Sequence, residues 1–303
     1  MALVKRKLRV TITLATISGQ AQTFDNSGGA DSVIIENLRM TASVMYAGAT
    51  SMGTLDLTIY GLSLSTINKL STMGLRLNQL PKNKIVLEAG EDPDGSGAFQ
   101  NGSTVYTGYT LSALADFNAS PETAFHISAQ TMAPQSVETA TASSFPGSAE
   151  IATIMSGIAT KLSLKFENSG VTGSLSNVYL SGSYKDQAQQ CVSDAGINWN
   201  AGEGGVLAIW PKFGSRGGQV PVISPQTGMV GYPTWSALGI DVRTLYNGSV
   251  GFGGKVHVDT SVSKASGDYT VYGLAHELDC EMPDGRWFSI VNCYNPVLNN
   301  ATS

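Results

Sequence analysis

The feature that most constrains the fold is a strict two-residue alternation of apolar and polar side chains. Leu8, Val10, Ile12 and Leu14 occupy every second position near the N-terminus, and residues 54–60 repeat the pattern. Successive side chains of a β-strand point to opposite faces of the sheet, so this period predicts strands with one buried face. A chain that shows it repeatedly is expected to fold mainly as β-sheet.

Short segments of similar composition, bounded by glycine, proline and asparagine, predict many further strands. We expect strands at residues 32–35, 40–46, 84–89, 105–117, 123–130, 163–167, 197–200, 206–210, 241–245, 255–259, 268–278 and 287–293. Residues 91–97 read as an exposed hairpin loop rich in turn-forming residues.

The period changes in three places, where helices are expected. Residues 63–73 predict a short helix, and residues 148–162 place five large apolar side chains on one helical face. Residues 183–195 predict another helix, which Gly196 ends. Residues 131–146 show little periodicity and read as a link.

This order of elements predicts an α+β chain, mainly β, with three domains. The first is a tube-like β-barrel domain at residues 1–132, the second a small α/β domain at residues 133–212, and the third a second tube-like β domain at residues 213–303. The apolar content of 42% is enough to bury a normal core.

The charge content limits the classes of binding partner that we expect. Only 14% of the residues are charged, the net charge is −5, and no long basic block occurs. Tight nucleic-acid binding needs clustered lysine and arginine, so we do not expect it. No apolar run reaches the eighteen or so residues that a membrane span needs, and the basic start does not resemble a signal peptide. Three cysteines without a CxxC pair favour a reducing compartment.

Metal and cofactor sites are not expected. His276, Glu277, Asp279 and Cys280 offer possible zinc ligands, but a strand sends His276 and Glu277 to opposite faces. No HExxH or paired-histidine spacing accompanies them. Residues 91–97 resemble a fragment of a calcium loop without its spacing and its terminal glutamate, so a solvated hairpin tip is the favoured interpretation.

Catalytic residues are not expected either. The other two histidines, His126 and His257, lie in predicted strands, and no G-x-S-x-G elbow is present. Residues 49–53 come closest to this motif, but they have alanine in place of its first glycine, and we interpret them as a turn. Two carboxylate pairs, Glu277 with Asp279 and Glu150 with Glu167, could be nominated for a hydrolase, but no motif selects them.

The order of motifs in the C-terminal half resembles the tail-hub proteins of tailed phages and prophages. It consists of PVISPQTGMVGYPTW at residues 221–235, GIDVRTLYN at 239–247, GFGGKVHVD at 251–259, and a strand ending in His276 before the tryptophan strand at 287–293. Gly248 stands where those proteins usually have proline. Residues 7–12, 52–61 and 144–155 are similar to hubs of contractile-tailed phages.

The resemblance covers nearly the whole chain and implies a baseplate hub, a structural protein without catalytic residues. It implies a homotrimer whose two barrels per subunit make a pseudo-sixfold ring. That ring would join the hexameric tail tube protein to the trimeric central spike protein and leave a channel through which DNA passes transiently. Tape-measure and other baseplate proteins are further expected partners, and the virion tail, assembled in the host cytoplasm, is the expected location.

Two other functions remain open at this point. One is a tail-associated peptidoglycan hydrolase, and the other is a receptor-binding or carbohydrate-binding β-protein. A binding module would gather exposed aromatic residues on one loop face, whereas Trp199, Trp210, Trp235 and Trp287 are scattered and read as core or interface anchors.

Overall fold

The computed structural model describes residues 4–15, 24, 31–47, 52–72, 83–118 and 122–295. These residues form two compact units. Unit 1 comprises residues 1–44, 53–134 and 277–287, and unit 2 comprises residues 45–52, 135–276 and 288–303. Each unit therefore draws on segments that are distant in the sequence.

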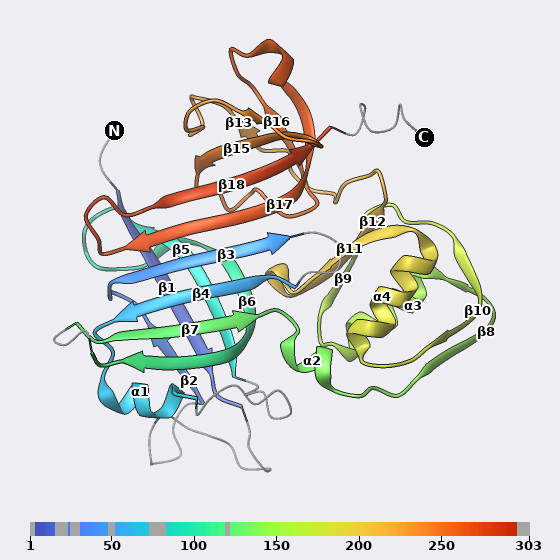
Figure 1. Ribbon diagram of the computed structural model, residues 1–303, viewed down its shortest axis with the longest axis horizontal. Coiled ribbons are helices and arrows are strands. Elements are labelled where there is room, and N and C mark those ends of the chain that lie inside the picture. The colour runs from blue at the N-terminus through green and yellow to red at the C-terminus, as the bar shows by residue number, and fades with distance from the viewer. Residues whose placement is uncertain are drawn as a thin grey trace. The chain divides into compact units, whose positions relative to one another are not determined.

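Unit 1 is built on antiparallel strands (Figure 1). They are β1 (Lys5–Thr13), β2 (Ser32–Ile35), β3 (Met40–Ala47, the unit holding it through Val44), β4 (Thr54–Tyr60), β5 (Lys84–Asp92), β6 (Gln100–Asp116) and β7 (Ala124–Gln130). Their spatial order is β3-β4-β7-β6-β5-β1-β2.

The alternation seen in the sequence defines the core of unit 1. Leu55, Leu57 and Ile59 of β4 are at most 1% exposed, and Phe125 of β7, opposite Ile59, is fully buried. Burying each such side chain contributes roughly 1.5–3 kcal/mol relative to leaving it in water. The alternate positions of the same strands are left on the opposite face.

Two local features complete unit 1. Helix α1 (Leu64–Leu70) begins after Ser63, whose hydroxyl accepts a hydrogen bond from the Thr66 N–H. The buried Lys7 ammonium of β1 reaches the β5–β6 hairpin, where it lies 3.6 Å from the Asp92 carboxylate and donates to the Gly97 carbonyl. Lys7 therefore holds the loop that was predicted at residues 91–97.

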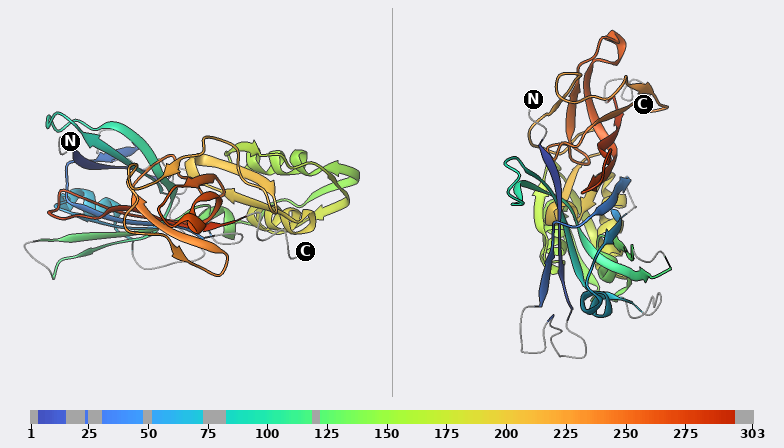
Figure 2. Two further views of the ribbon diagram at one scale, coloured as in Figure 1. Left: turned by 90° about the horizontal axis from the view of Figure 1, so that it is seen from above. Right: turned by 90° about the vertical axis from the view of Figure 1, so that its left-hand side faces the viewer.

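The first part of unit 2 combines helices with two small sheets. Its elements are α2 (Ala133–Val137, the unit holding it from Gln135), β8 (Ser143–Glu150), α3 (Ile151–Lys161), β9 (Lys165–Asn168), β10 (Ser174–Leu180), α4 (Tyr184–Ala195), β11 (Ile197–Ala201), the 3-10 turn η2 (Glu203–Gly205) and β12 (Val206–Pro211). One sheet pairs β10 with β8, and the other has the order β11-β12-β9. Helices α3 and α4 pack against each other (Figures 1 and 2).

Both ends of α4 carry strong sequence signals. The Ser183 hydroxyl accepts from the Asp186 N–H, while the Asp186 carboxylate accepts from the Ser183 N–H, which forms a capping box. Gly196 ends the helix in the left-handed conformation, with φ of 62°. The predicted helix at residues 183–195 is thereby confirmed.

The remainder of unit 2 is β again. Its elements are β13 (Val222–Ile223), β14 (Thr234–Trp235), β15 (Gly239–Leu245), β16 (Lys255–Val258), the 3-10 turn η3 (Ser263–Ala265), β17 (Gly267–Cys280) and β18 (Trp287–Tyr294). The order is β14-β15-β18-β17, and β16 lies between β17 and β13. Residues 277–280 of β17 and residue 287 of β18 belong to unit 1.

Three sequence-based expectations need correction. Residues 131–146 are not an irregular link, because they contain α2 and the start of β8. The helix expected from residue 148 begins at Ile151, because Ser148, Ala149 and Glu150 pair with β10. Strand β10 itself was not predicted: Asn177 has a φ of 53°, and a register shift beside it breaks the alternation.

The mainly β fold is confirmed. The three-domain division stays a prediction. The boundaries of the two compact units differ from those of the three expected domains. Most of the turn expected at residues 49–53 lies outside the described residues. The same holds for residue 73, the last residue of the helix expected at 63–73. Within the described part of the chain, no helix is long and apolar enough to cross a membrane.

Candidate functional site

One exposed sheet face of unit 1 is polar and carries little charge. Strands β4 and β7 place Asp56 opposite Ser128 and Thr58 opposite His126, and β6 adds Ser112 beside Ser128. Residues opposite each other in a ladder share a face, so these five side chains lie together. We call Ser112, Asp56, Thr58, His126 and Ser128 the polar face.

The polar face contains hydroxyl groups, one carboxylate and one imidazole. The Thr58 hydroxyl lies 3.0 Å from Nδ1 of His126, which fixes the orientation of that ring. Leu114 of β6, opposite His126 and 51% exposed, is an apolar neighbour. None of the residue pairs that join β4, β7 and β6 includes a lysine or an arginine.

The arginines that the structure describes are all held by other side chains. Four lie with the guanidinium over an aromatic ring: Arg6 over Trp287, Arg9 over Phe99, Arg39 over Tyr60 and Arg243 over Phe288. Arg216 and Arg286 bind carboxylates. Held guanidinium groups are less available to bind phosphate, because their donors and faces are already in use.

Arg216 forms the most buried of these contacts, within unit 2. Its guanidinium lies 3.0 Å from Glu167 of β9 and 2.6 Å from Glu203 of η2, and it also donates to the Phe252 carbonyl. Burial raises the pKa of Glu203, although Arg216 opposes that shift. Burial also acts to raise the pKa of Glu167, but the hydrogen bond and charge of Arg216 outweigh it, and the pKa falls.

The two remaining histidines lie in different surroundings. His276 is buried, its Nδ1 lies 2.9 Å from the Ser289 hydroxyl, and burial lowers its pKa to about 4. His257 is exposed, and its Nδ1 lies 2.6 Å from Asp268 on the neighbouring strand. Neither imidazole contacts a serine or cysteine in a nucleophile–base–acid arrangement, since Ser289 is itself fully buried.

Three of the four carboxylates nominated for a hydrolase lie beside arginines. Arg286 holds Asp279 through Nε at 3.0 Å and approaches Glu277 at 3.8 Å. Glu167 belongs to the Arg216 cluster, while Glu150 lines an open hollow at the start of α3. A carboxylate whose oxygens are already engaged by a guanidinium is less available to act as a general acid or a nucleophile.

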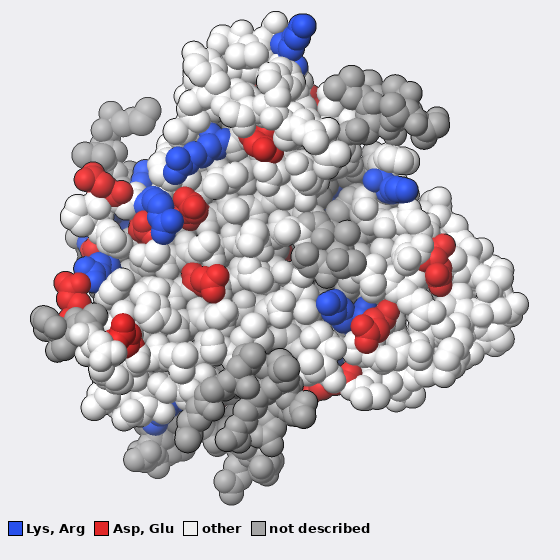
Figure 3. Space-filling model, in the orientation of Figure 1, with Lys and Arg blue, Asp and Glu red and all other residues white. Residues whose placement is uncertain are grey.

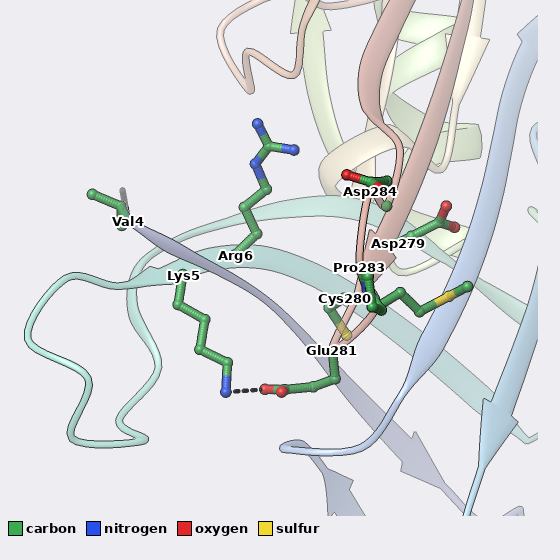
Figure 4. Close-up of a pocket in the computed structure, with 10 residues that line it drawn as sticks. Val4, Lys5, Arg6, Asp279, Cys280, Glu281, Pro283 and Asp284 are labelled. Carbon is green, nitrogen blue, oxygen red and sulfur yellow. Dashed lines mark ion pairs between the residues drawn. The ribbon is translucent and has the colours of Figure 1, made fainter. Parts of the chain in front are cut away.

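A shallow hollow of about 480 Å³ opens at the β17–β18 hairpin in unit 1 (Figure 4). The start of β1 forms one side, and Lys5 closes it by pairing with Glu281 at 2.7 Å. Asp279 belongs to the Arg286 pair, and Arg6 lies over the Trp287 ring. Most of its charges are therefore paired already, and the hollow offers no evident ligand chemistry.

No metal centre is formed by the residues that the structure describes, since nowhere among them do three or more His, Cys, Asp or Glu side chains cluster suitably. In the loop at residues 91–97, which resembles a fragment of a calcium loop, Asp94 binds Ser96, and Asp92 binds Gly97 and Lys7. Cys191, Cys280 and Cys293 are free and buried, and burial raises their thiol pKa to about 11, 11 and 12. Such thiols are inert at neutral pH.

The tryptophans divide into two groups. Trp199, Trp210 and Trp287 are buried, whereas Trp235 of β14 is 62% exposed. Trp235 lies in a segment, residues 217–240, that contains no charged residue, and nearby Tyr232 is 69% exposed. On the face drawn in Figure 3, charged side chains form small groups, several of mixed sign, which are separated by wide uncharged areas.

Several of these features could not be found by sequence motifs. The polar face depends on strand register, and the Arg216 cluster joins Glu167 and Arg216 across 49 positions. The period-two alternation marks Asp56 and Thr58 as outward-facing, but it does not show which strands stand beside them. The uncharged run around Trp235 was readable from the sequence and was not singled out.

Comparison with solved structures shows where this fold occurs. The tail protein from Neisseria meningitidis MC58 superposes with a TM-score of 0.61 at 10% identity, covering 95% of this chain and 96% of that one. The 43 kDa tail protein of prophage MuSo2 from Shewanella oneidensis gives 0.60 at 8% identity, covering 95% and 97%. A chain of the half-lidded Francisella PdpA–VgrG complex gives 0.52 at 8% identity, covering 97% and 59%.

At such identities these likenesses show the fold alone, which is that of phage tail proteins. No curated protein sequence matches the chain. A family model described as baseplate hub gp41 matches residues 8–293, which is nearly the whole length. This protein therefore belongs to the baseplate hub gp41 family, a family of structural proteins of the phage tail.

Proposed function

We propose that three copies of this hub protein form a pseudo-sixfold ring that joins the hexameric tail tube to the trimeric spike. Two β regions per chain supply six similar positions when three chains assemble, which reconciles a sixfold neighbour with a threefold one. The likeness to a chain of the PdpA–VgrG complex supports a role for this fold inside a larger assembly.

The ring would leave a channel for DNA, and the polar face is the observation that supports this part of the proposal. Fixed lysine and arginine side chains trap DNA because phosphate binding releases counterions. The ladder pairs of β4, β7 and β6 contain neither residue, and Asp56 adds a negative charge. A wall of this kind would let DNA slide without adhering to it.

The protein would act without catalysis, cofactor or metal, and it would assemble in the host cytoplasm before joining the virion tail. The family is structural, and the carboxylates nominated for hydrolysis are held in ion pairs or stand apart. The buried, free cysteines suit folding in a reducing compartment.

Electron cryo-microscopy of intact tails tests the proposal. We expect threefold density for this chain between tube and spike, three copies per tail, and the β4–β7 surface facing the central axis. Six copies per tail, or a location away from the axis, contradicts the ring. A bore lined mainly by lysine and arginine contradicts the channel.

A further inference from the structure

Lys7 of β1 is a buried cation at a position where the alternation of the strand predicts an exposed side chain. Lys5 and Arg9 lie on the same face of β1, and their side chains are 50% and 30% exposed, whereas that of Lys7 is 3% exposed. The loop at residues 91–97 closes over Lys7. Burying an ammonium is costly unless other groups replace its water shell, so the groups around Lys7 Nζ have to do so.

Three oxygen atoms from separate segments of unit 1 converge on the Lys7 ammonium, and we call them the oxygen cage. The ammonium donates to the Gly97 carbonyl at 3.0 Å and to Asn37 Oδ1, and it lies 3.6 Å from Asp92 Oδ2. Carbonyl, amide and carboxylate oxygens are the ligands that hard cations take in proteins. Backbone carbonyls also replace the hydration shell of K⁺ in channel filters. The cage is therefore a set of cation ligands around a cation that belongs to the chain.

The oxygen cage has acceptor capacity that the ammonium leaves unused. Asp92 is buried, and its second oxygen, Oδ1, has no hydrogen-bond partner among the described residues. The 3.6 Å between Lys7 Nζ and Asp92 Oδ2 is longer than a hydrogen bond. A free cation, which no side chain holds back, could approach this carboxylate more closely. Asn37 is exposed, so the cage can be reached from solvent on that side.

Contacts that do not involve the ammonium also hold the cage in shape. The Gly97 N–H donates to Asp92 Oδ2 at 3.1 Å. The Phe99 ring fills the space beside Gly90 and Gly102, where a Cβ atom would collide with it. We therefore expect the loop to keep its path when the ammonium is removed, which leaves its oxygens placed for another cation.

The charge of the oxygen cage favours a monovalent ion. One carboxylate, from Asp92, and two neutral oxygens balance a single positive charge. The neighbouring Asp94 is exposed, and its carboxylate accepts a hydrogen bond from Ser96 instead. Calcium sites gather about six to eight oxygen ligands, several of them charged, so this cage suits a divalent ion poorly.

From these observations we propose that the oxygen cage is a monovalent cation site, which the native chain fills with its own Lys7 ammonium. K⁺ and NH₄⁺ have the charge of the lysine ammonium and are close to it in size, so they are the class of ligand that takes its place when it is removed. A cation tethered to the chain is not lost by dilution or exchange. The loop at residues 91–97 is thereby fixed whatever ions the solution contains.

Removal and replacement of the ammonium test the site in the purified full chain. Lys7→Ala deletes the cation, and amide hydrogen exchange of residues 92–98 is measured in KCl, in NH₄Cl and in tetramethylammonium chloride, whose cation is too large for the cage. In tetramethylammonium we expect exchange about tenfold faster than in the native protein, because hydrogen bonds to a charged group are lost. K⁺ and NH₄⁺ at equal ionic strength should restore most of the protection. The native protein should exchange equally in all three salts.

Lys5→Ala is the matched control, because Lys5 lies on the same face of β1 and its pair with Glu281 is half-exposed. It should show no difference between the salts. Lys7→Ala combined with Asp92→Asn removes the charge of the cage, and its exchange should no longer respond to K⁺. Equal exchange of Lys7→Ala in K⁺ and in tetramethylammonium, or an equal K⁺ response in either of the other variants, would overturn the site. If Lys7→Ala is unfolded in tetramethylammonium, folding in K⁺ supports the site, and failure to fold in both salts refutes it.

Discussion

The ring of Tyr246 stands edge-on to the buried imidazole of His276, with 5.2 Å between the ring centroids and 74° between the planes. The Ser289 hydroxyl lies 2.9 Å from Nδ1 of this imidazole, and both side chains are buried. Burial lowers its pKa to about 4, which means that the folded protein holds His276 neutral over most of the accessible pH range.

We expect this imidazole to make unfolding easier in acid. The unfolded chain takes up a proton near pH 6.5, whereas the folded chain does so only near pH 4, so stability is lost as the pH falls between these values. The loss reaches about 3 kcal/mol. Urea unfolding of the wild type and of His276→Gln from pH 7.5 to 4 measures it, and the variant should show a flatter profile. If the pH profiles of the wild type and the variant ran parallel, His276 would not be the cause of the loss of stability in acid.

Removing Arg216 is expected to destabilise unit 2 strongly. Arg216→Gln leaves Glu203 and Glu167, whose side chains are 19% and 33% exposed, beside each other without a counter-charge. Breaking a fully buried ion pair costs about 3–5 kcal/mol, and for this partly exposed cluster we expect the lower end of that range. Arg39→Gln is the matched control, because its pair with Glu122 has the same 2.6 Å separation but is solvent-exposed. It should cost under about 1 kcal/mol. Equal effects in thermal or urea unfolding would refute the distinction.

A cation on the polar face is expected to slow DNA passage. In the proposed channel, Asp56→Lys presents several lysines per ring to the phosphates, whereas Asp56→Asn removes charge without adding a cation. We expect virions with Asp56→Lys to release DNA more slowly, most clearly at low salt, and Asp56→Asn to behave as the wild type. Real-time fluorescence of released DNA gives the rates. Equal rates for all three would place the polar face away from the DNA path.

The purified chain is expected to show no hydrolysis of peptidoglycan. Glu277 and Asp279 are held by Arg286, and Glu167 is held by Arg216. Turbidity of a cell-wall suspension should stay constant with the protein present and fall with a lysozyme control. If the protein cleared the suspension and Asp279→Asn abolished that clearing, this protein would have a hydrolase activity in addition to its structural role.

Local sequence signals predicted individual elements well. Strand β4 matches its expected limits, because its alternation is unbroken, and α4 matches because Ser183 and Gly196 mark its ends. Strand β10 was missed, since Asn177 interrupts its period. The early part of β8 was missed as well, since its strand character depends on pairing with β10.

The candidate surfaces were less predictable, because they depend on non-local pairing. Asp56 and Ser128 stand side by side only through the register of β4 on β7. Sequence periodicity shows that both face outward, but it cannot show that they face outward together. The resemblance to tail hubs predicted the family correctly, while the contacts within the assembly require strand order as well as motif order.

Unit 1 takes its first strands from the N-terminus and its closing segment from residues 277–287. During translation, the strands that emerge first therefore lack part of their unit until residues 277–287 have left the ribosome. Domains usually fold in the order of their synthesis. In this protein the unit that begins first is completed only after residues 135–276 of the other unit have been made, so a product truncated before residue 277 lacks part of unit 1.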